Sequence, residues 1–190
     1  MKIVHVTTGL SDGGAEAILY RLIASDKKAN VHVVISMTKD DKYGDMLERK
    51  GIDVHYLNLL TPLEMIRASV KLYRLLRKIS PDVVQTWMYH ANLFGGLVSY
   101  LAGYRKVVWS IHGPYNKALT SLKLRIMILF SGLLAKIFRY VIVSPSTYAV
   151  RSHVNLGYPE NQFISIPNGC DVDLFNVTIA KGIEFRKKYD

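Results

Sequence analysis

"VHVTTGLSDGGAEAILYRLI", residues 4–23, joins an apolar strand pattern to a helix pattern with only a short turn between them. Two adjacent glycines, Gly13 and Gly14, stand at the junction. Glycine lets a backbone approach a ligand closely, and the unpaired N–H groups of a helix N-terminus suit a phosphate. Helix capping by Asp12 or Gly13, with Glu16 folding back, accounts for the same residues. Both interpretations stay open, because the glycine spacing is neither the dinucleotide fingerprint nor a P-loop.

The alternation of strand and helix patterns continues along the chain. Short runs rich in Val and Ile are apolar on both faces, as parallel strands covered by helices must be. We expect strands at Lys2–Thr7, Val31–Met37, Val54–Leu57, Asp82–Thr86, Lys106–Ile111 and Tyr140–Ser144. We expect helices at Gly14–Ala29, Tyr43–Lys50, Pro62–Ile79, His90–Ala102, Leu119–Phe138 and Ser146–Val154. This order predicts an α/β fold, a Rossmann-like open parallel sheet with helices on both faces.

Composition limits the classes of function. The chain has 190 residues, 49% of them hydrophobic, and a formal net charge of +10. That surplus favours anionic partners such as acidic lipid, phosphorylated small molecules or nucleic acid. The single cysteine, Cys170, excludes an intrachain disulfide and a thiolate metal cluster, and fits a reducing compartment. No pair of histidines has metal-ligand spacing, so we expect no metal.

The hydropathy pattern bears on membrane association. No secretory signal pattern follows the N-terminal Met1-Lys2. The most apolar window, Ile126–Ala135, is shorter than the roughly 20 residues that cross a bilayer. We therefore expect a protein that is soluble or peripheral to a membrane.

Three polar residues lie where a ligand is expected. In open parallel sheets, ligands bind in the crevice outside the carboxyl ends of the strands. His112 ends the fifth strand before a Gly-Pro turn, which makes it the catalytic candidate, although a lone histidine is equally explained as structural. His90, at a helix start, and Ser144, at the end of the sixth strand, also follow strands at this edge.

One helix carries a stripe of cations. Arg67, Lys71, Arg74 and Lys78 fall on one helical face, and we expect Ile66, Val70 and Leu76 on the opposite one. An ordinary solvated face explains the stripe. The lack of interleaved acids favours an anionic surface instead, with lipid as the first candidate. Nucleic acid is less favoured, because no aromatic residues interleave and no binding motif is present.

Five segments, in order, resemble a known family. "MKIVHVTTGLSDGGAEAILYRL" and "PDVVQTWMYHANLFGGLVSYLAG" are similar to the first and fourth strands, with their helices, of the retaining glycosyltransferases of family 4. "VVWSIHG" and "YVIVSPS" resemble the strands that end in the family's histidine and serine. "IPNGCDVDLF" fits its Pro-Asn-Gly-x-Asp signature. The resemblance covers residues 2 to about 175.

The resemblance implies a GT-B enzyme, in which two Rossmann-like domains face each other across a cleft. Residues 1–170 would be the N-terminal, acceptor-side domain, and residues 171–190 a linker or the start of the second domain. That second domain supplies most nucleotide-sugar contacts in the family. The family also implies transfer from a nucleotide sugar to a glycan or lipid-linked acceptor with retention of configuration, in cell-surface polysaccharide or glycolipid biosynthesis.

Residue roles follow from the same resemblance. Gly13 and Gly14 would approach the donor diphosphate, Glu16 would hold their loop, and His112 would sit beside the acceptor and the sugar–phosphate bond. No metal or other cofactor is implied, and many relatives dock at the inner face of the cell membrane. The resemblance also makes His90 and Ser144 candidates for the wall of the cleft. Ser144 is followed by Pro-Ser, where relatives usually have an acid, so its role is open.

Two functional hypotheses are favoured over a third, a nucleic-acid-binding domain that only the charge supports. The first is the acceptor half of a cytoplasmic or membrane-peripheral glycosyltransferase, inactive when isolated. The second is a non-catalytic module that binds anionic glycan or lipid through the sheet crevice and the cationic stripe.

Overall fold

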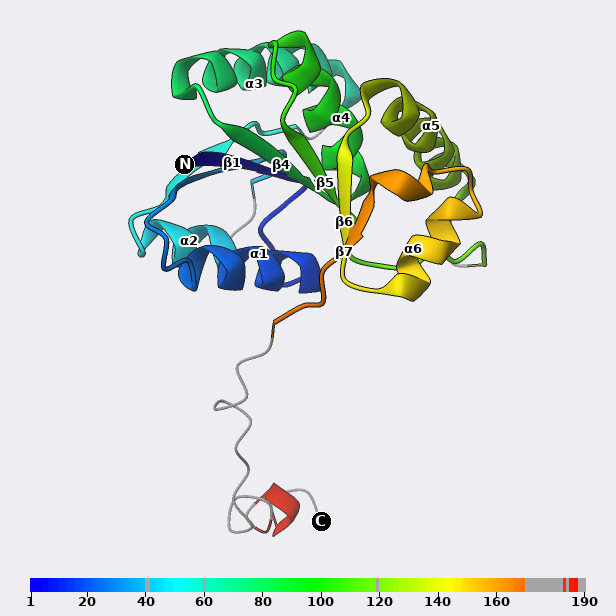
Figure 1. The fold of residues 1–190 in the computed structure, drawn as a ribbon. Helices are drawn as coiled ribbons and strands as arrows, with labels where there is room; N and C mark the ends of the chain where they lie inside the picture. Colours follow the sequence, from blue (N-terminus) through cyan, green and yellow to red (C-terminus); the bar gives the residue numbers. More distant parts are fainter. Residues whose placement is uncertain (40–41, 60, 119, 170–182, 184, 188–190) are drawn as a thin grey trace.

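The structure is a computed structural model that describes residues 1–39, 42–59, 61–118, 120–169, 183 and 185–187. Its centre is one seven-stranded parallel sheet in the order β3-β2-β1-β4-β5-β6-β7 (Figure 1). The strands are β1 Lys2–Thr7, β2 Val31–Ser36, β3 Asp53–Tyr56, β4 Val83–Trp87, β5 Val107–Ser110, β6 Val141–Ser144 and β7 Phe163–Ser165. The predicted Rossmann-like parallel sheet is confirmed.

Six of the seven strands are predicted from the sequence to within one residue at both ends. The apolar runs form the centre of the sheet, where β1 pairs in parallel with β2 on one side and β4 on the other. The seventh strand, β7, is not predicted. It has only three residues and pairs with β6 at the edge, so its sequence carries too short an apolar run to be recognised.

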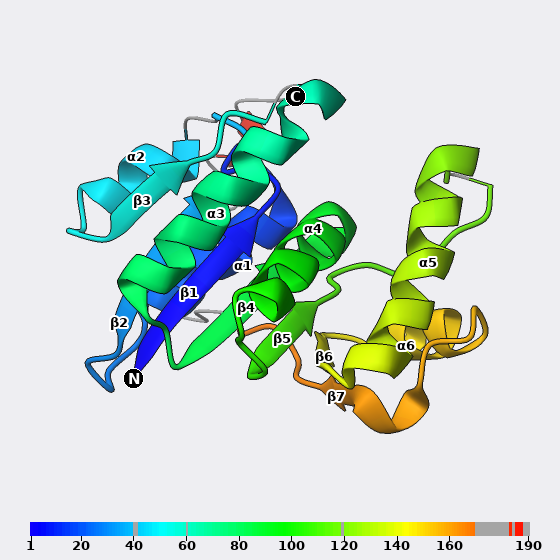
Figure 2. The same cartoon turned by 90° about the horizontal axis from the view of Figure 1, so that it is seen from above.

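The helices cover both faces of the sheet, as predicted (Figures 1 and 2). They are α1 Gly14–Ala24, α2 Lys42–Glu48, α3 Met65–Ile79, α4 Met88–Leu101, α5 Leu122–Phe138 and α6 Thr147–Val154, with short 3₁₀ turns at Pro62–Glu64 and Glu160–Gln162. Helices α1 and α2 pack with one cluster of buried side chains that includes Leu19 and Leu47. Helices α3, α4 and α5 contribute to a larger cluster on the other face.

Helix α1 is shorter than predicted. It ends at Ala24 rather than Ala29. The Asp26 carboxylate accepts hydrogen bonds from the Lys28 backbone N–H at 2.8 Å and from Asn30 Nδ2 at 2.7 Å. These bonds hold a turn that competes with helical hydrogen bonding. The predicted boundary was therefore wrong, because the Asp26 carboxylate offers the Lys28 backbone N–H an acceptor outside the helix.

Helix α4 lies closest to the sheet because its glycines permit it. A Cβ at Gly96 would lie 2.6 Å from Trp109 Nε1, and one at Gly95 would lie 3.0 Å from Val6 Cγ1. The Tyr140 hydroxyl donates to the Gly96 carbonyl oxygen at 3.0 Å. Close packing at this depth leaves no room for a larger residue. Because α4 begins at Met88, directly after β4 ends at Trp87, its N-terminus lies at the carboxyl end of β4.

The predicted domain boundary at residue 170 lies where the continuous described part of the chain ends, at residue 169. Most of the segment 171–190, predicted as a linker or the start of a second domain, lies outside the described residues.

Candidate functional site

A cavity of about 850 Å³ opens on the face of the sheet that carries α1. In the described part of the chain, α1 and α2 pack on this face over β1 and β2, whereas the floor of the cavity comes from β4, β5 and β6. Gln85 and Ser110 lie on that floor, and the Gln85 amide donates to the Ser110 hydroxyl at 2.8 Å. One wall is the C-terminal half of α1, and the other is the segment Ile166–Gly169.

His112 lies at one end of this cavity. Its imidazole stacks on the indole of Trp87, with ring centroids 4.9 Å apart and planes inclined by 9°. Both of its ring nitrogens are buried, and neither has a hydrogen-bond partner among the described residues. Burial lowers the pKa of His112 below its usual 6.5. The ring is therefore neutral near pH 7 and has one donor and one acceptor free for a ligand.

A chain of hydrogen bonds fixes the indole on which His112 stacks. The Trp87 Nε1–H can only donate, and it points to His5 Nδ1 at 3.3 Å. His5 must then donate from Nε2 to His32 Nδ1, 3.0 Å away. His32 in turn donates from Nε2 to the Asp26 carboxylate at 2.9 Å. The direction of every bond follows from the single donor at Trp87, so the tautomers of both histidines are determined.

Burial makes His5 a source of pH-dependent stability. Desolvation, with repulsion from His32 as a smaller cause, lowers the pKa of His5 from 6.5 to about 3. In the unfolded chain the same imidazole takes up a proton below pH 6.5, so the unfolded state binds more protons than the native state between these pH values. Stability contributed by His5 is therefore complete above pH 6.5 and is lost as the pH falls toward 3.

We expect the free energy of unfolding to fall by about 2 kcal/mol between pH 7 and pH 5 from His5 alone. Urea denaturation at pH 5, 6 and 7 measures it. His5→Phe should lower stability at pH 7 but flatten the acid dependence, whereas His55→Gln, at a more exposed site, should leave the slope unchanged. An equally steep slope in His5→Phe would contradict the assignment.

The two glycines at the start of α1 differ in what surrounds them. Gly13 is the N-cap, and a Cβ there would lie 2.2 Å from Glu16 Oε2, so the glycine makes room for the Glu16 carboxylate. No side-chain hydrogen bond caps the helix at this position. A Cβ at Gly14 would meet no atom within 4 Å. Nothing in the described chain therefore requires glycine at residue 14.

The remaining cleft candidates lie at the same edge of the sheet but outside the cavity lining. Ser144 ends β6, fully buried, with a hydroxyl that has no partner among the described residues. His90 lies exposed in the first turn of α4, which begins at Met88 rather than at His90 as predicted. Met88 has a φ of 67°, an uncommon value for a residue other than glycine, at the junction of β4 and α4. The glycine loop, His90 and Ser144 are not part of the cavity lining, whereas His112 and the Pro-Asn-Gly segment, residues 167–169, line it.

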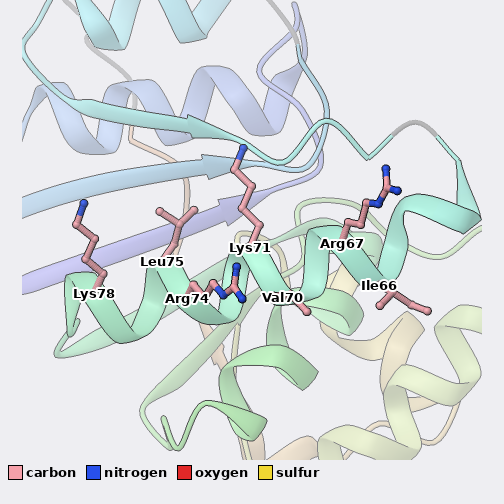
Figure 3. A pocket seen from close by; sticks show the side chains of 7 residues that line it. All are labelled: Ile66, Arg67, Val70, Lys71, Arg74, Leu75 and Lys78. Atoms are coloured by element: carbon pink, nitrogen blue, oxygen red, sulfur yellow. The ribbon is translucent and has the colours of Figure 1, made fainter.

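The predicted cationic stripe lies along a shallow groove on α3 (Figure 3). Arg67, Lys71, Arg74 and Lys78 all line it. The predicted position of the apolar residues was wrong in part. Ile66 and Val70 are exposed by 76% and 43% and lie along the same groove, while Ala68, Leu72 and Leu76 form the buried face. The buried face follows an i, i+4, i+8 row, which places residues 66 and 70 outside it.

The described residues offer neither a metal site nor a membrane-spanning helix. No group of three or more His, Cys, Asp or Glu side chains among them could hold a metal ion. Within the same residues, every helix is too short or too polar to cross a bilayer.

The family follows from the comparison with known protein families. Residues 12–174 match the family model described as Glycosyltransferase Family 4. The chain belongs to glycosyltransferase family 4. No curated protein sequence matches this family 4 chain.

Solved structures share its fold at low sequence identity. HepE of Anabaena, solved in complex with UDP, has a TM-score of 0.82 and 18% identity, over 100% of this chain and 50% of HepE. A glycosyltransferase from Rickettsia africae has a TM-score of 0.70 and 19% identity, over 100% and 49%. The family 4 chain thus spans about half the length of these structures, and its sheet is the Rossmann-like N-terminal half of a GT-B fold.

The fold by itself does not determine the reaction. A UDP-GlcNAc 2-epimerase from Methanocaldococcus jannaschii has a TM-score of 0.63 and 17% identity, over 88% of this family 4 chain and 46% of the epimerase. Which reaction a protein of this fold catalyses depends on the residues of its site.

The sequence places Gln85 and Trp87 at the carboxyl end of the fourth strand, where a ligand is expected, but it assigns neither of them a role in the site. Both face the cavity from β4, on the side of the sheet opposite Val84 and Thr86. A signal was present, because Gln in an otherwise apolar parallel strand needs a polar partner. The partner, Ser110, could be recognised only from the pairing of β4 with β5.

Proposed function

We propose that this chain is the acceptor-side half of a retaining glycosyltransferase. The enzyme transfers a sugar from a nucleotide-sugar donor to a glycan or lipid-linked acceptor, in the biosynthesis of cell-surface polysaccharide or glycolipid. The observation that carries the proposal is His112, a neutral imidazole at the end of a cavity in a family 4 domain, whose two ring nitrogens have no hydrogen-bond partner in the described part of the chain. The UDP complex and the UDP-glucose complex of HepE support a nucleotide sugar as donor.

The proposed chemistry rests on positioning and electrostatics. A neutral His112 can accept from an acceptor hydroxyl at one nitrogen and donate to the donor at the other. The first turn of α1, free of side chain at Gly14, offers backbone N–H groups and a positive dipole end to the departing diphosphate. That phosphate would take the acceptor's proton on the same face from which it leaves, which retains configuration. Neither a metal nor another cofactor has a part in this scheme.

The isolated 190-residue chain is expected to be inactive. It spans about half of the GT-B structures that it matches. The resemblance to the family implies that the second domain supplies most nucleotide-sugar contacts. The decisive experiment measures binding and transfer for a panel of nucleotide sugars with the full-length protein and with this chain alone. Binding of a donor by the full-length protein supports the proposal. Failure to bind any nucleotide sugar would refute it.

The groove on α3 supports a second activity, the binding of anionic glycan or lipid. Four cations and two exposed apolar side chains lie along it. With sugar transfer, this surface would hold the enzyme at the inner, cytoplasmic face of the cell membrane. If the protein does not transfer sugar, the chain would be a binding module only. It would then bind anionic glycan or lipid but no nucleotide sugar.

Reversing three charges tests the groove. Arg67→Glu, Lys71→Glu and Arg74→Glu together should lower binding to anionic vesicles at least tenfold at low salt, since each cation near such a surface contributes about 1 kcal/mol. Vesicle co-sedimentation at two salt concentrations measures the effect. Reversal of Lys27, Lys28 and Lys50 on the α1–α2 side is the control. Equal binding of the α3 variant and the parent would show that the stripe is merely solvated.

A further inference from the structure

Helix α5 exposes an apolar face to solvent. Six large apolar side chains fall within about 100° of its circumference, at 100° per residue. They are Leu122, Ile126, Leu129, Phe130, Leu133 and Ile137, with exposures from 41% to 71%. The opposite side of the helix, with Ile128 and Ala135, is buried in the core. Soluble proteins seldom expose a continuous apolar patch of this kind without a partner for it.

Cations border the apolar face on both sides. Lys123 lies next to its edge on one side, and Arg125 and Lys136 lie next to the other edge. Long basic side chains can cover apolar surface with their methylene groups while their charges reach the polar layer. Apolar side chains between flanking Lys and Arg are the composition of a helix that lies in the plane of a membrane interface.

The charges of the chain are segregated between the two layers of helices. Residues 65–159, which supply α3 to α6, contain thirteen Lys or Arg and a single acid, Asp82. The Asp82 carboxylate accepts a hydrogen bond from the Lys2 backbone N–H, at the amino end of the sheet. Residues 1–64, which supply α1 and α2, contain eight Lys or Arg and nine acids. An anionic surface would therefore attract the α3–α6 layer and not the α1–α2 layer.

We propose that the apolar face of α5 inserts into the headgroup region of an anionic lipid bilayer, with the helix parallel to the membrane plane. Helix α4 lies beside α5 and adds the exposed leucines Leu97 and Leu101 (Figure 2). The chain continues from β7 along the opposite side of the sheet, where Ile166–Gly169 line the cavity (Figure 1). The outer surface of α5 is thus left open by the described chain.

This placement also orients the site. Helix α5 follows β5, so it begins at the carboxyl edge of the sheet, the edge at which His112 lies. Because the inserted helix lies parallel to the membrane plane, its whole length, including the end at this edge of the sheet, would lie in the headgroup layer. This further step rests on the proposed sugar transfer: a site held close to the headgroup layer favours an acceptor carried by a lipid over a free glycan. The insertion itself does not depend on sugar transfer and extends the contact proposed for α3 to a second element with an apolar contribution.

The test uses the full-length protein with vesicles of phosphatidylcholine, alone or mixed with phosphatidylglycerol. The variant Ile126→Gln with Leu133→Gln should lower the partition coefficient on mixed vesicles at least about tenfold, because two inserted apolar side chains are lost. Val31→Gln with Ile164→Gln removes two side chains of similar exposure from outside this face and should change little. Circular dichroism and thermal unfolding confirm that both variants are folded.

A fluorescent label measures insertion directly. These 190 residues contain one cysteine, so Cys170→Ser, with replacement of every cysteine that the full-length protein carries outside them, provides a background for Leu133→Cys or, as control, Lys28→Cys on the α1 side. An environment-sensitive dye at residue 133 should shift to the blue on mixed vesicles, and the dye at residue 28 should not.

Three results would overturn the inference. One is equal partition of the parent and the Ile126/Leu133 variant. Another is a blue-shifted dye at residue 133 before vesicles are added, which would show that protein covers the face. The third is a dimer in sedimentation that the two glutamines dissociate, which would assign the face to a second copy. None of these assays needs a sugar donor, so failure of the proposed transferase activity leaves the test intact.

Discussion

Replacing His112 by alanine is expected to lower kcat of the full-length enzyme about 10²–10³-fold, the range of a group that positions or exchanges a proton in the transition state. The fold should survive. His112 makes no hydrogen bond among the described residues, and its stack on Trp87 is its one ring contact, worth about 1 kcal/mol. Steady-state kinetics with a donor identified from the panel, together with thermal unfolding, measures both effects.

The control for this variant is His55→Ala. His55 lies on β3, remote from the cavity lining, and its Nε2 is 3.1 Å from an exposed Asp53 carboxylate. It should retain kcat within about twofold, as expected for a surface substitution. If His112→Ala also retained activity near that of the parent, the histidine would be structural and the site would have to be sought elsewhere along the sheet edge.

Enlarging Gly14 is expected to raise the KM for the donor at least tenfold and to leave the KM for the acceptor nearly unchanged. A Cβ at Gly14 meets no atom of the described chain, so Gly14→Ala and Gly14→Val should fold normally. The added methyl groups would instead occupy the space over the first turn of α1, where a diphosphate would approach the backbone.

A graded series distinguishes the two explanations of the glycine pair. The effect on the donor should grow from Gly14→Ala to Gly14→Val, because it depends on the volume added toward the ligand. Gly13→Ala instead displaces the Glu16 carboxylate, and its effect should be similar when Glu16 is also alanine. Unchanged donor KM and kcat in Gly14→Val would mean that the glycine only forms the turn.

The fold was largely predictable because its signal is local. Apolar runs such as "KIVHV" and "YVIVS" can be buried only as parallel strands between helices, and the intervening helical patterns require crossover connections. Errors arose where a few side chains decided the outcome. Asp26 ended α1 early through its hydrogen bonds, and β7 is held mainly by its pairing with β6.

The candidate site was predictable only in its position along the chain. That His112 follows a strand, and so lies at the carboxyl edge of the sheet, could be inferred from the sequence. Its stack on Trp87, and the chain of bonds from Trp87 through His5, could not, because these residues are far apart in sequence and meet through strand pairing and twist. His5, a histidine inside an apolar strand pattern, holds the indole that supports the candidate catalytic ring.

The sequence by itself determined the parallel α/β class and the excess of positive charge. It also determined that the glycine loop and His112 lie at the same edge of the sheet. Period, length and composition are local properties and need no knowledge of neighbours. Only the tertiary structure decided which apolar residues are exposed. The row from Leu122 to Ile137 looks like any core helix until packing buries Ile128 and Ala135 and leaves the other side of α5 in solvent, because burial depends on which face meets the sheet.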